Sequence, residues 1–362
     1  MLIVDGHLDL AMNALQNNRN LLVDVWTTRA RESHDTGKGK GKGTVALPEM
    51  RQGRIALCFT TVFGLCTTGR TIPHFDFDSP TQSYAIARAQ LSYYEALQRE
   101  GHVRIVTSLD QLKRHLKEWT QWDSGPADNP GPPPPLGLVI SMESADALMD
   151  PDQLEEWYNA GLRLLGPSHS GEGRYAGGTG SDTGLTELGS PLLQEMQRLG
   201  IPLDLTHTSD RAFWECLDHY EGLAFASHVN SRVLVPHQRE LDDRQLGAIL
   251  ERDGVIGVTL GNWQLQFEWK CGGRNDHLRV TLDRAIDHID HICQLAGDDR
   301  HVAIGSDLDG GVGTDEFPHD LETITDLQKL APLLSKRRYS DQAIERILSG
   351  NWLSFLIKAW SE

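Results

Sequence analysis

The chain has 362 residues, of which 39% are hydrophobic, so it is long enough and apolar enough to bury a large core. Its formal net charge of −17 at pH 7 argues against a nucleic-acid-binding protein, because such proteins normally present a basic surface. No apolar run approaches the roughly 18 residues that a membrane-spanning helix needs. A strand is predicted from residue 2, so no secretory signal is expected before it. We therefore expect a cytoplasmic protein with neither nucleic acid nor membrane as a partner.

The cysteines favour the same compartment. There are five of them, an odd number, and they lie far apart at Cys58, Cys66, Cys216, Cys271 and Cys293. No Cys-x-x-Cys pair occurs, so the sequence predicts neither a zinc knuckle nor a disulfide framework. Free thiols indicate a reducing environment.

Apolar, β-branched stretches alternate with amphipathic helical stretches along the chain. In chain order, strands are predicted at 2–7, 54–64, 102–108, 136–143, 162–169, 201–207, 223–228, 255–260 and 301–307. Helices are predicted between them at 80–100, 109–119, 151–161, 190–200, 209–220, 241–254 and 281–297, and three more helical stretches end the chain.

This order predicts the fold class. With 102–108 set aside as an accessory strand, eight strands remain, and apolar strands separated by helices indicate a parallel sheet covered on both faces. Eight such units predict a (β/α)8 barrel of the TIM type, an α/β fold. An open doubly wound sheet is the alternative, against which the lack of a GxGxxG fingerprint after the first strand counts. We expect one barrel domain over 1–362, with additional C-terminal helices at 320–362 packed on the barrel.

Two irregular stretches interrupt the pattern. Residues 35–44, DTGKGKGKGT, are predicted to form a flexible, solvated loop, with a basic phosphate-binding loop as the alternative. Residues 123–137, DSGPADNPGPPPPLG, are predicted to be a stiff surface connector into the next strand. A ligand for a proline-recognition domain is the alternative for that segment.

Histidines and acidic residues follow six of the eight strands. A single histidine at a strand end is usually structural, but the carboxyl ends of barrel strands meet at one pocket, so their repetition favours a shared site. The residues are, in chain order, His7, Asp9, Glu143, His169, His207, His228 and Asp307.

Imidazole and carboxylate groups of this kind suit Zn²⁺, and suit Mn²⁺ or Fe²⁺ less well. No cysteine is among them, which favours an open catalytic site over a closed structural one. Four histidines and three acids exceed the ligands of one tetrahedral ion, so two ions that share a carboxylate are favoured. Such a pair lowers the pKa of bound water towards 7, and an acid outside the ligand set can move protons.

These residues and their order resemble the renal or membrane dipeptidase family, within the amidohydrolase superfamily of metal-dependent barrels. The resemblance runs through nearly the whole chain, in segments such as VDGHLDL, SMESAD, GLRLLGPSHS, FASHVNSRVLVPHQRELDD and HVAIGSDLDGG. It implies a metallopeptidase of the bacterial type that hydrolyses small dipeptides. The signal peptide, disulfides and lipid anchor of the animal enzymes are not expected, and a homodimer is implied.

The same resemblance implies a ligand set for two Zn²⁺ per chain. His7, Asp9 and Glu143 hold the first ion in that family pattern. Glu143, His207 and His228 hold the second, so Glu143 bridges the two.

Three further roles follow from the resemblance. His169 contacts the substrate and stabilises the tetrahedral oxyanion. Arg239 binds the terminal carboxylate of the substrate, for which its planar guanidinium is suited. Asp307 takes a proton from the attacking water and delivers it to the leaving amine. Glu240 follows Arg239 where the family more often has asparagine, and an acid there is expected to weaken carboxylate binding.

The implied reaction is therefore hydrolysis of the amide bond of a dipeptide, with tolerance of a D-residue at the C-terminal position. Because a fold does not fix chemistry, two alternatives remain open. One is another metal-dependent amidohydrolase, such as an N-acyl amino acid amidohydrolase or a lactonase. The other is a metal-binding homologue that has lost activity.

Overall fold

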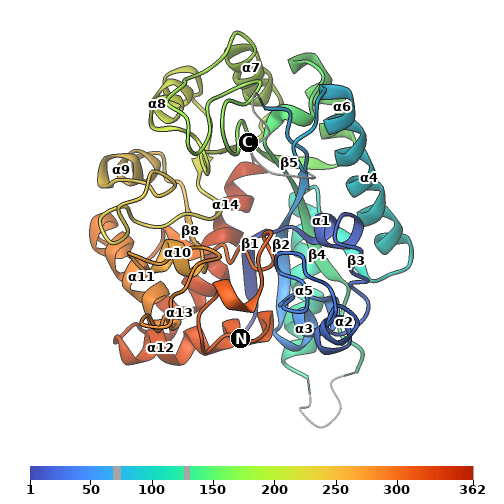
Figure 1. Cartoon of the computed structure of the whole chain (residues 1–362), viewed down its shortest axis with the longest axis vertical. Helices are drawn as coiled ribbons and strands as arrows, with labels where there is room; N and C mark the ends of the chain where they lie inside the picture. The colour runs from blue at the N-terminus through green and yellow to red at the C-terminus, as the bar shows by residue number, and fades with distance from the viewer. Residues whose placement is uncertain (68–74, 126–130, 362) are drawn as a thin grey trace.

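The computed structural model describes residues 1–67, 75–125 and 131–361. Within these residues the strands form one parallel sheet in the order β7-β6-β5-β4-β2-β1-β9-β8, with β3 beside β4. Ala226, directly after β7, bridges Ile256 of β8 in parallel, so the sheet closes on itself. The molecule is therefore the predicted (β/α)8 barrel, with its helices arranged around the strands (Figure 1).

The strands are β1 (Ile3–Leu8), β2 (Ile55–Phe63), β3 (Val103–Ile105), β4 (Leu136–Glu143), β5 (Leu162–Gly166), β6 (Leu203–Asp204), β7 (Ala224–Phe225), β8 (Ile256–Val258) and β9 (Val302–Ile304). The α-helices are α1 (Leu10–Leu15), α2 (Val25–Arg31), α3 (Leu47–Gln52), α4 (Pro80–Arg99), α5 (Leu109–Asp123), α6 (Leu154–Asn159), α7 (Gly189–Leu199), α8 (Asp210–His219), α9 (Asp243–Glu251), α10 (Asn262–Leu265), α11 (Asp283–Ala296), α12 (Leu330–Lys336), α13 (Asp341–Glu345) and α14 (Asn351–Ala359).

Each predicted strand is present, and within the described ranges β3 pairs only with β4, which confirms that it is accessory to the barrel. Several strands end earlier than predicted, so that His207 and His228 lie three residues beyond β6 and β7. The connection between β1 and β2, for which no helix was predicted, contains α1, α2 and α3. These helices have six or seven residues each, too few to give a clear helical period in the sequence.

Local sequence signals explain where the longer helices begin and end. Ser79 caps α4 by accepting a hydrogen bond from the Gln82 amide, and Pro80 occupies the first turn, where its missing N–H is not needed. Asp242 and Gln245 form a reciprocal capping box at the start of α9. Gly297 ends α11 in the left-handed conformation that glycine adopts without strain.

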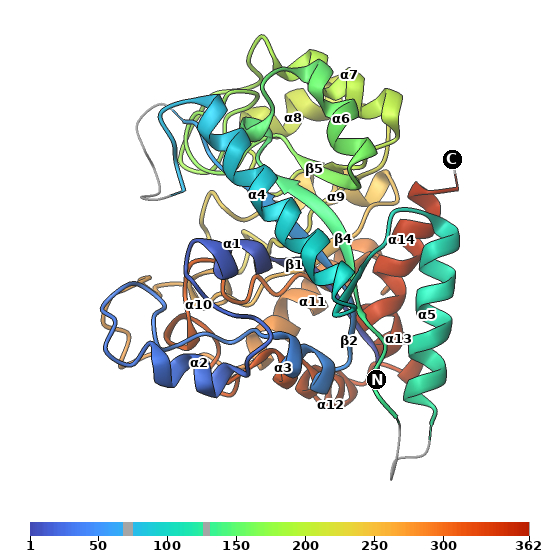
Figure 2. The same ribbon diagram turned by 90° about the vertical axis from the view of Figure 1, so that its right-hand side faces the viewer.

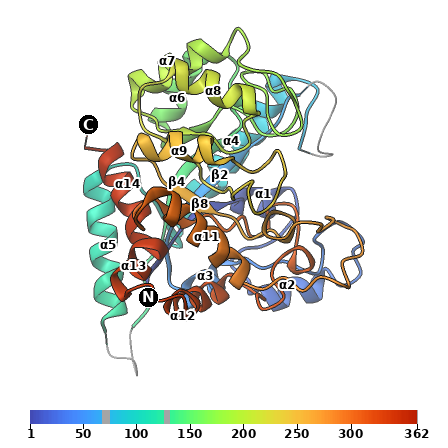
Figure 3. The ribbon, with the colours of Figure 1, turned by 90° about the vertical axis from the view of Figure 1, so that its left-hand side faces the viewer.

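The C-terminal helix α14 packs apolar side chains against the barrel strands. The ring of Trp352 packs against Phe59 of β2, with ring centroids 4.8 Å apart, and its Nε1 donates to the Ile304 carbonyl of β9. A Cβ at Gly6 would lie 2.6 Å from the Trp352 ring, so only glycine fits directly before His7. In Figures 2 and 3, α14 and α5 lie on the side of the molecule that holds the N-terminus, whereas α2 lies on the opposite side, together with α10 in Figure 2. The carboxyl ends of the strands are thus left free for a site.

The proline-rich segment 123–137 joins α5 to β4, and its residues 126–130 lie outside the described residues. On either side of that gap, Trp122 Nε1 donates to the Gly131 carbonyl at 3.2 Å and Trp119 Nε1 to the Pro135 carbonyl at 3.0 Å. Its role as a stiff connector stays a prediction. Among the helices of the described residues, none has both the length and the apolar character needed to cross a bilayer.

Candidate metal centre

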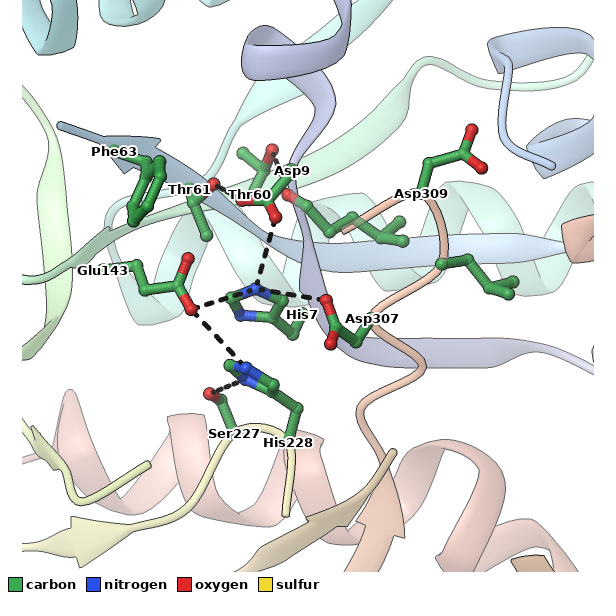
Figure 4. Close-up of polar contacts among 12 residues, drawn as sticks. His7, Asp9, Thr60, Thr61, Phe63, Glu143, Ser227, His228, Asp307 and Asp309 are labelled. Carbon is green, nitrogen blue, oxygen red and sulfur yellow. Dashed lines mark hydrogen bonds and ion pairs between the residues drawn. The ribbon is translucent and has the colours of Figure 1, made fainter. Parts of the chain in front are cut away.

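The seven residues predicted from the strand ends lie together at one end of the barrel. Glu143, the last residue of β4, faces His7 and His228 in Figure 4. The Nε2 atoms of four histidines surround its Oε1 atom: His207 at 3.2 Å, His228 at 3.5 Å, His7 at 3.6 Å and His169 at 3.8 Å.

Two further acids, Asp9 and Asp307, also lie close to His7. The Nε2 atom of His7 is 3.9 Å from Asp9 Oδ2 and 4.0 Å from Asp307 Oδ1. Their ligand atoms form overlapping sets, each compact enough to hold one ion: His7, Glu143 and His228; Glu143, His169 and His207; and His7, Asp9 and Asp307. Because Glu143 belongs to two of these sets, the arrangement has room for more than one ion around a shared carboxylate.

The backbone turns sharply where two of the side chains enter the site. His207 has φ of 69° and Asp307 has φ of 56°, left-handed values that are uncommon for residues other than glycine. Such conformations persist only where the surrounding structure fixes them, and they gather at functional sites. Here they turn the chain at the ends of β6 and β9, beside the central carboxylate.

Hydroxyl groups orient three of the clustered side chains. Ser227 Oγ lies 2.8 Å from His228 Nδ1, Thr179 Oγ1 lies 3.2 Å from His207 Nδ1, and Thr61 Oγ1 donates to Asp9 Oδ1. Contacts at Nδ1 fix the ring so that Nε2 faces the centre, as the outer partners of metal-binding histidines do. Sequence reasoning missed all three hydroxyls. Of the three, only Ser227 could have been found from the sequence, because it directly precedes His228.

The protonation of three of the four histidines suits a metal site. Burial lowers the pKa of His169 to about 3, and lowers those of His207 and His228 well below their ordinary value. These three rings are therefore neutral at pH 7, the form that binds metal. Burial also lowers the pKa of His7, but the carboxylates of Glu143 and Asp9 outweigh it and raise that pKa to about 10.

The buried carboxyl groups of Glu143 and Asp307 need a neighbouring positive charge to be ionised at neutral pH. Burial raises the pKa of Glu143 well above its ordinary value and that of Asp307 to about 7, because a buried carboxylate is unfavourable without compensating charge. His7 Nε2 is buried and has no hydrogen-bond partner among the described residues. An unpartnered imidazole nitrogen among buried carboxylates is a donor set that fits a divalent cation such as Zn²⁺.

Arg239 brings a cation to the edge of this centre. Its side chain is buried, and its Nη2 donates to the His228 carbonyl at 2.9 Å and lies 3.2 Å from His207 Nε2. Its Nη1 is buried without a hydrogen-bond partner in the described residues. The guanidinium thus has an unused donor beside the histidines, which suits an incoming carboxylate.

Glu240 does not share the cavity with Arg239. Its side chain is fully buried, and Oε2 accepts a hydrogen bond of 2.6 Å from the Asn230 amide. The acid that was expected to weaken carboxylate binding is therefore held away from the cavity lining.

Glu240 gives a prediction for stability. Burial raises its pKa from 4.5 to about 7, although the charge of Arg239 opposes the shift. Between these pH values the folded protein binds more protons than the unfolded chain, so this residue makes stability fall as the pH rises. Glu240→Gln keeps an acceptor for Asn230 and removes the titration. We expect the free energy of unfolding of the variant, relative to wild type, to increase by up to about 3 kcal/mol between pH 4 and pH 8 in urea titrations. A difference independent of pH would contradict this.

Two cavities open onto the centre, and Asp9, Glu143 and His169 line both. The first cavity has a volume of about 330 Å³ and includes Arg239 and Trp263. The second has a volume of about 680 Å³ and includes the apolar side chains of Met12, Phe63 and Phe75. A small molecule that spans both cavities would thus pass Asp9, Glu143 and His169.

The sequence matches a family of known proteins over its length. The model of the family described as membrane dipeptidase, peptidase family M19, matches residues 1–360. An uncharacterized dipeptidase of Schizosaccharomyces pombe is 25% identical over 361 residues, which cover 97% of this chain and 79% of that protein. An uncharacterized protein of Klebsiella pneumoniae, from the pqqA 5′ region, is 33% identical over 236 residues, 63% of this chain and 83% of that protein.

Solved structures agree with this match. The crystal structure of dipeptidase AC, a metallopeptidase of family M19, is 25% identical with a TM-score of 0.79, covering 100% of this chain and 99% of that one. A metallopeptidase from Rhodobacter sphaeroides has the same fold, with a TM-score of 0.78 at 24% identity and coverage of 99% of both chains.

Proposed function

The chain belongs to the membrane dipeptidase family and is a metal-dependent peptide hydrolase, and from this premise we propose that it is a binuclear zinc dipeptidase. The observation that carries the proposal is the position of Glu143, whose Oε1 faces the Nε2 atoms of four histidines. A carboxylate shared in this way suits a bridge between two ions.

In this proposal His7, Asp9 and Glu143 hold one zinc ion, and Glu143, His207 and His228 hold the other. Every one of these residues belongs to at least one of the compact sets of ligand atoms. When bound, the two ions would polarise the scissile carbonyl and make water more acidic.

The remaining roles belong to side chains of the chain itself. Arg239 binds the free carboxylate of the dipeptide, which sets the distance from that end to the scissile bond and so selects short substrates. His169 lines the cavity beside Glu143 and donates a hydrogen bond to the oxygen of the scissile carbonyl. Asp307, which also faces this cavity, receives a proton from the attacking water and delivers it to the departing amine.

The proposal extends to the whole chain. We propose a single catalytic domain over 1–362, in which the C-terminal helices of 320–362 support the barrel, as Trp352 does by packing against Phe59 of β2. We also propose a homodimer and acceptance of a D-residue at the C-terminal position, both from the family resemblance. Light scattering tests the dimer against the chain mass of 40.3 kDa.

Activity and metal content together test the proposal. We expect zinc-loaded protein to hydrolyse L-Ala-L-Ala and L-Ala-D-Ala. Removal of metal by dipicolinate is expected to lower the rate by at least about a thousandfold, and two equivalents of zinc per chain to restore it. Faster hydrolysis of an N-acyl amino acid or a lactone would indicate another amidohydrolase, and bound zinc with no turnover of any of these would indicate an inactive homologue.

A further inference from the structure

The glycine- and lysine-rich segment 35–44 is attached to the barrel mouth, although no strand or helix forms within it. Gly39 and Gly41 have φ of 71° and 69°, left-handed values that favour glycine. Buried Arg19 donates to the Gly39 carbonyl at 2.7 Å, and the Gly41 amide donates to Glu32 at 2.8 Å. In Figure 2 this loop, which follows α2, lies beside the loop that follows α10. These contacts hold the backbone of Gly39 and Gly41 at the barrel mouth.

The three lysines of this loop have different surroundings. Lys40 Nζ lies 3.6 Å from Glu32 Oε1, and Lys42 Nζ lies 2.7 Å from Asp315 Oδ2. Lys38 forms no ion pair with a carboxylate of the described residues. Its charge is therefore the one in this loop that is left for another partner.

Lys38 lies where that partner would be a substrate. It lines both cavities that open onto the metal centre, and its side chain contacts the thiol of Cys271, which lines the first cavity. Lys42 lines neither cavity, and Lys40 lines only the second. Lys38 thus brings a cation to both cavities, the first of which Arg239 also lines.

The second cavity has an apolar wall that suits the methylene groups of a side chain. Met12, Phe63 and Phe75 belong to one small apolar cluster, and all three line this cavity. If Arg239 holds the terminal carboxylate and the scissile carbonyl lies at Glu143, the first residue of a dipeptide extends into this second cavity. Its side chain then meets the apolar wall of a cavity that Lys38 also lines.

We propose that Lys38 pairs with a side-chain carboxylate on the first residue of the substrate, so that the enzyme prefers dipeptides that begin with glutamate or aspartate. This inference rests on the proposed dipeptidase function. The wall of the second cavity accommodates the methylene groups, and the cation selects the charge. A charge-assisted hydrogen bond of this kind distinguishes a carboxylate from an amide of the same shape.

The test compares Glu-Ala with Gln-Ala, which differ only in that charge. We expect wild type to favour Glu-Ala by about tenfold in kcat/KM, mainly through KM, and high salt to reduce this ratio. Lys38→Met is expected to bring the ratio to about one, and Lys38→Glu to favour Lys-Ala instead. Lys42→Met, in the same loop but outside both cavities, is the matched control and should retain the wild-type ratio.

Other results would overturn the inference. One such result is a Glu-Ala to Gln-Ala ratio that is unchanged in Lys38→Met. Another is a loss of kcat/KM in this variant that is confined to Ala-Glu, which would place Lys38 beside the second residue of the substrate. If wild type cleaves Ala-Ala but shows no preference for an acidic first residue, this inference fails and the dipeptidase function stands. If no dipeptide is cleaved, the proposed function fails, and calorimetric affinities for Glu-Ala and Gln-Ala still decide whether Lys38 selects the carboxylate.

Discussion

Replacing Glu143 with glutamine is expected to lower kcat/KM for dipeptides by at least about a thousandfold and to reduce bound zinc from two ions per chain to one or none. The substitution keeps the size of the side chain but removes the charge that four imidazole Nε2 atoms face at 3.2 to 3.8 Å. A neutral amide cannot hold two cations close together. Kinetics with Ala-Ala and elemental analysis of the same preparation measure both effects.

The matched control for this variant is Glu49→Gln. Glu49 is also a buried carboxylate, on α3, and accepts a hydrogen bond from the Val25 amide, but it lines neither cavity of the metal centre. Its substitution is expected to leave zinc content and kcat/KM close to wild type. If Glu143→Gln keeps two zinc ions and full turnover, Glu143 is not the bridging ligand.

Replacing Arg239 with lysine is expected to raise KM for dipeptides about a hundredfold, a loss of about 2.7 kcal/mol in binding, with a smaller effect on kcat. Lysine keeps the positive charge but has no planar fork, so it cannot hold the His228 carbonyl and a substrate carboxylate together. Steady-state kinetics at fixed zinc measure this separation of KM from kcat.

A substrate change isolates the carboxylate contact. Ala-Ala amide lacks the terminal carboxylate, so wild type should lose about as much kcat/KM on this substrate as Arg239→Lys loses on Ala-Ala. The amide should cost the variant little more, because the same contact is already absent. If the losses of kcat/KM from the amide substrate and from Arg239→Lys were independent and additive, Arg239 would not be the partner of the terminal carboxylate.

The fold and the gathering of the strand-end histidines and acids were predictable because they depend on short-range patterns. Strands such as β4 are continuous apolar runs, and a parallel barrel brings the ends of all its strands to one place. Glu143, the last residue of its strand, and His228, three residues beyond β7, therefore reached the same centre although they lie far apart in the sequence.

Other parts of the site depend on contacts between distant residues that carry no local pattern. Asp309 accepts hydrogen bonds from the amides of Thr44 and Val45, more than 260 residues earlier, and so fixes the end of the lysine-rich loop. Thr61 orients Asp9 from a strand that ends in neither histidine nor acid. Such partners become visible only when the barrel is closed.

Anomalous scattering at the zinc edge from a crystal of the zinc-loaded protein is the most direct test of the binuclear centre. We predict two peaks at the carboxyl end of the barrel, each with an oxygen of Glu143 among its ligands and with His7 on one and His207 and His228 on the other. A single peak, or two peaks that share no ligand, would contradict the account.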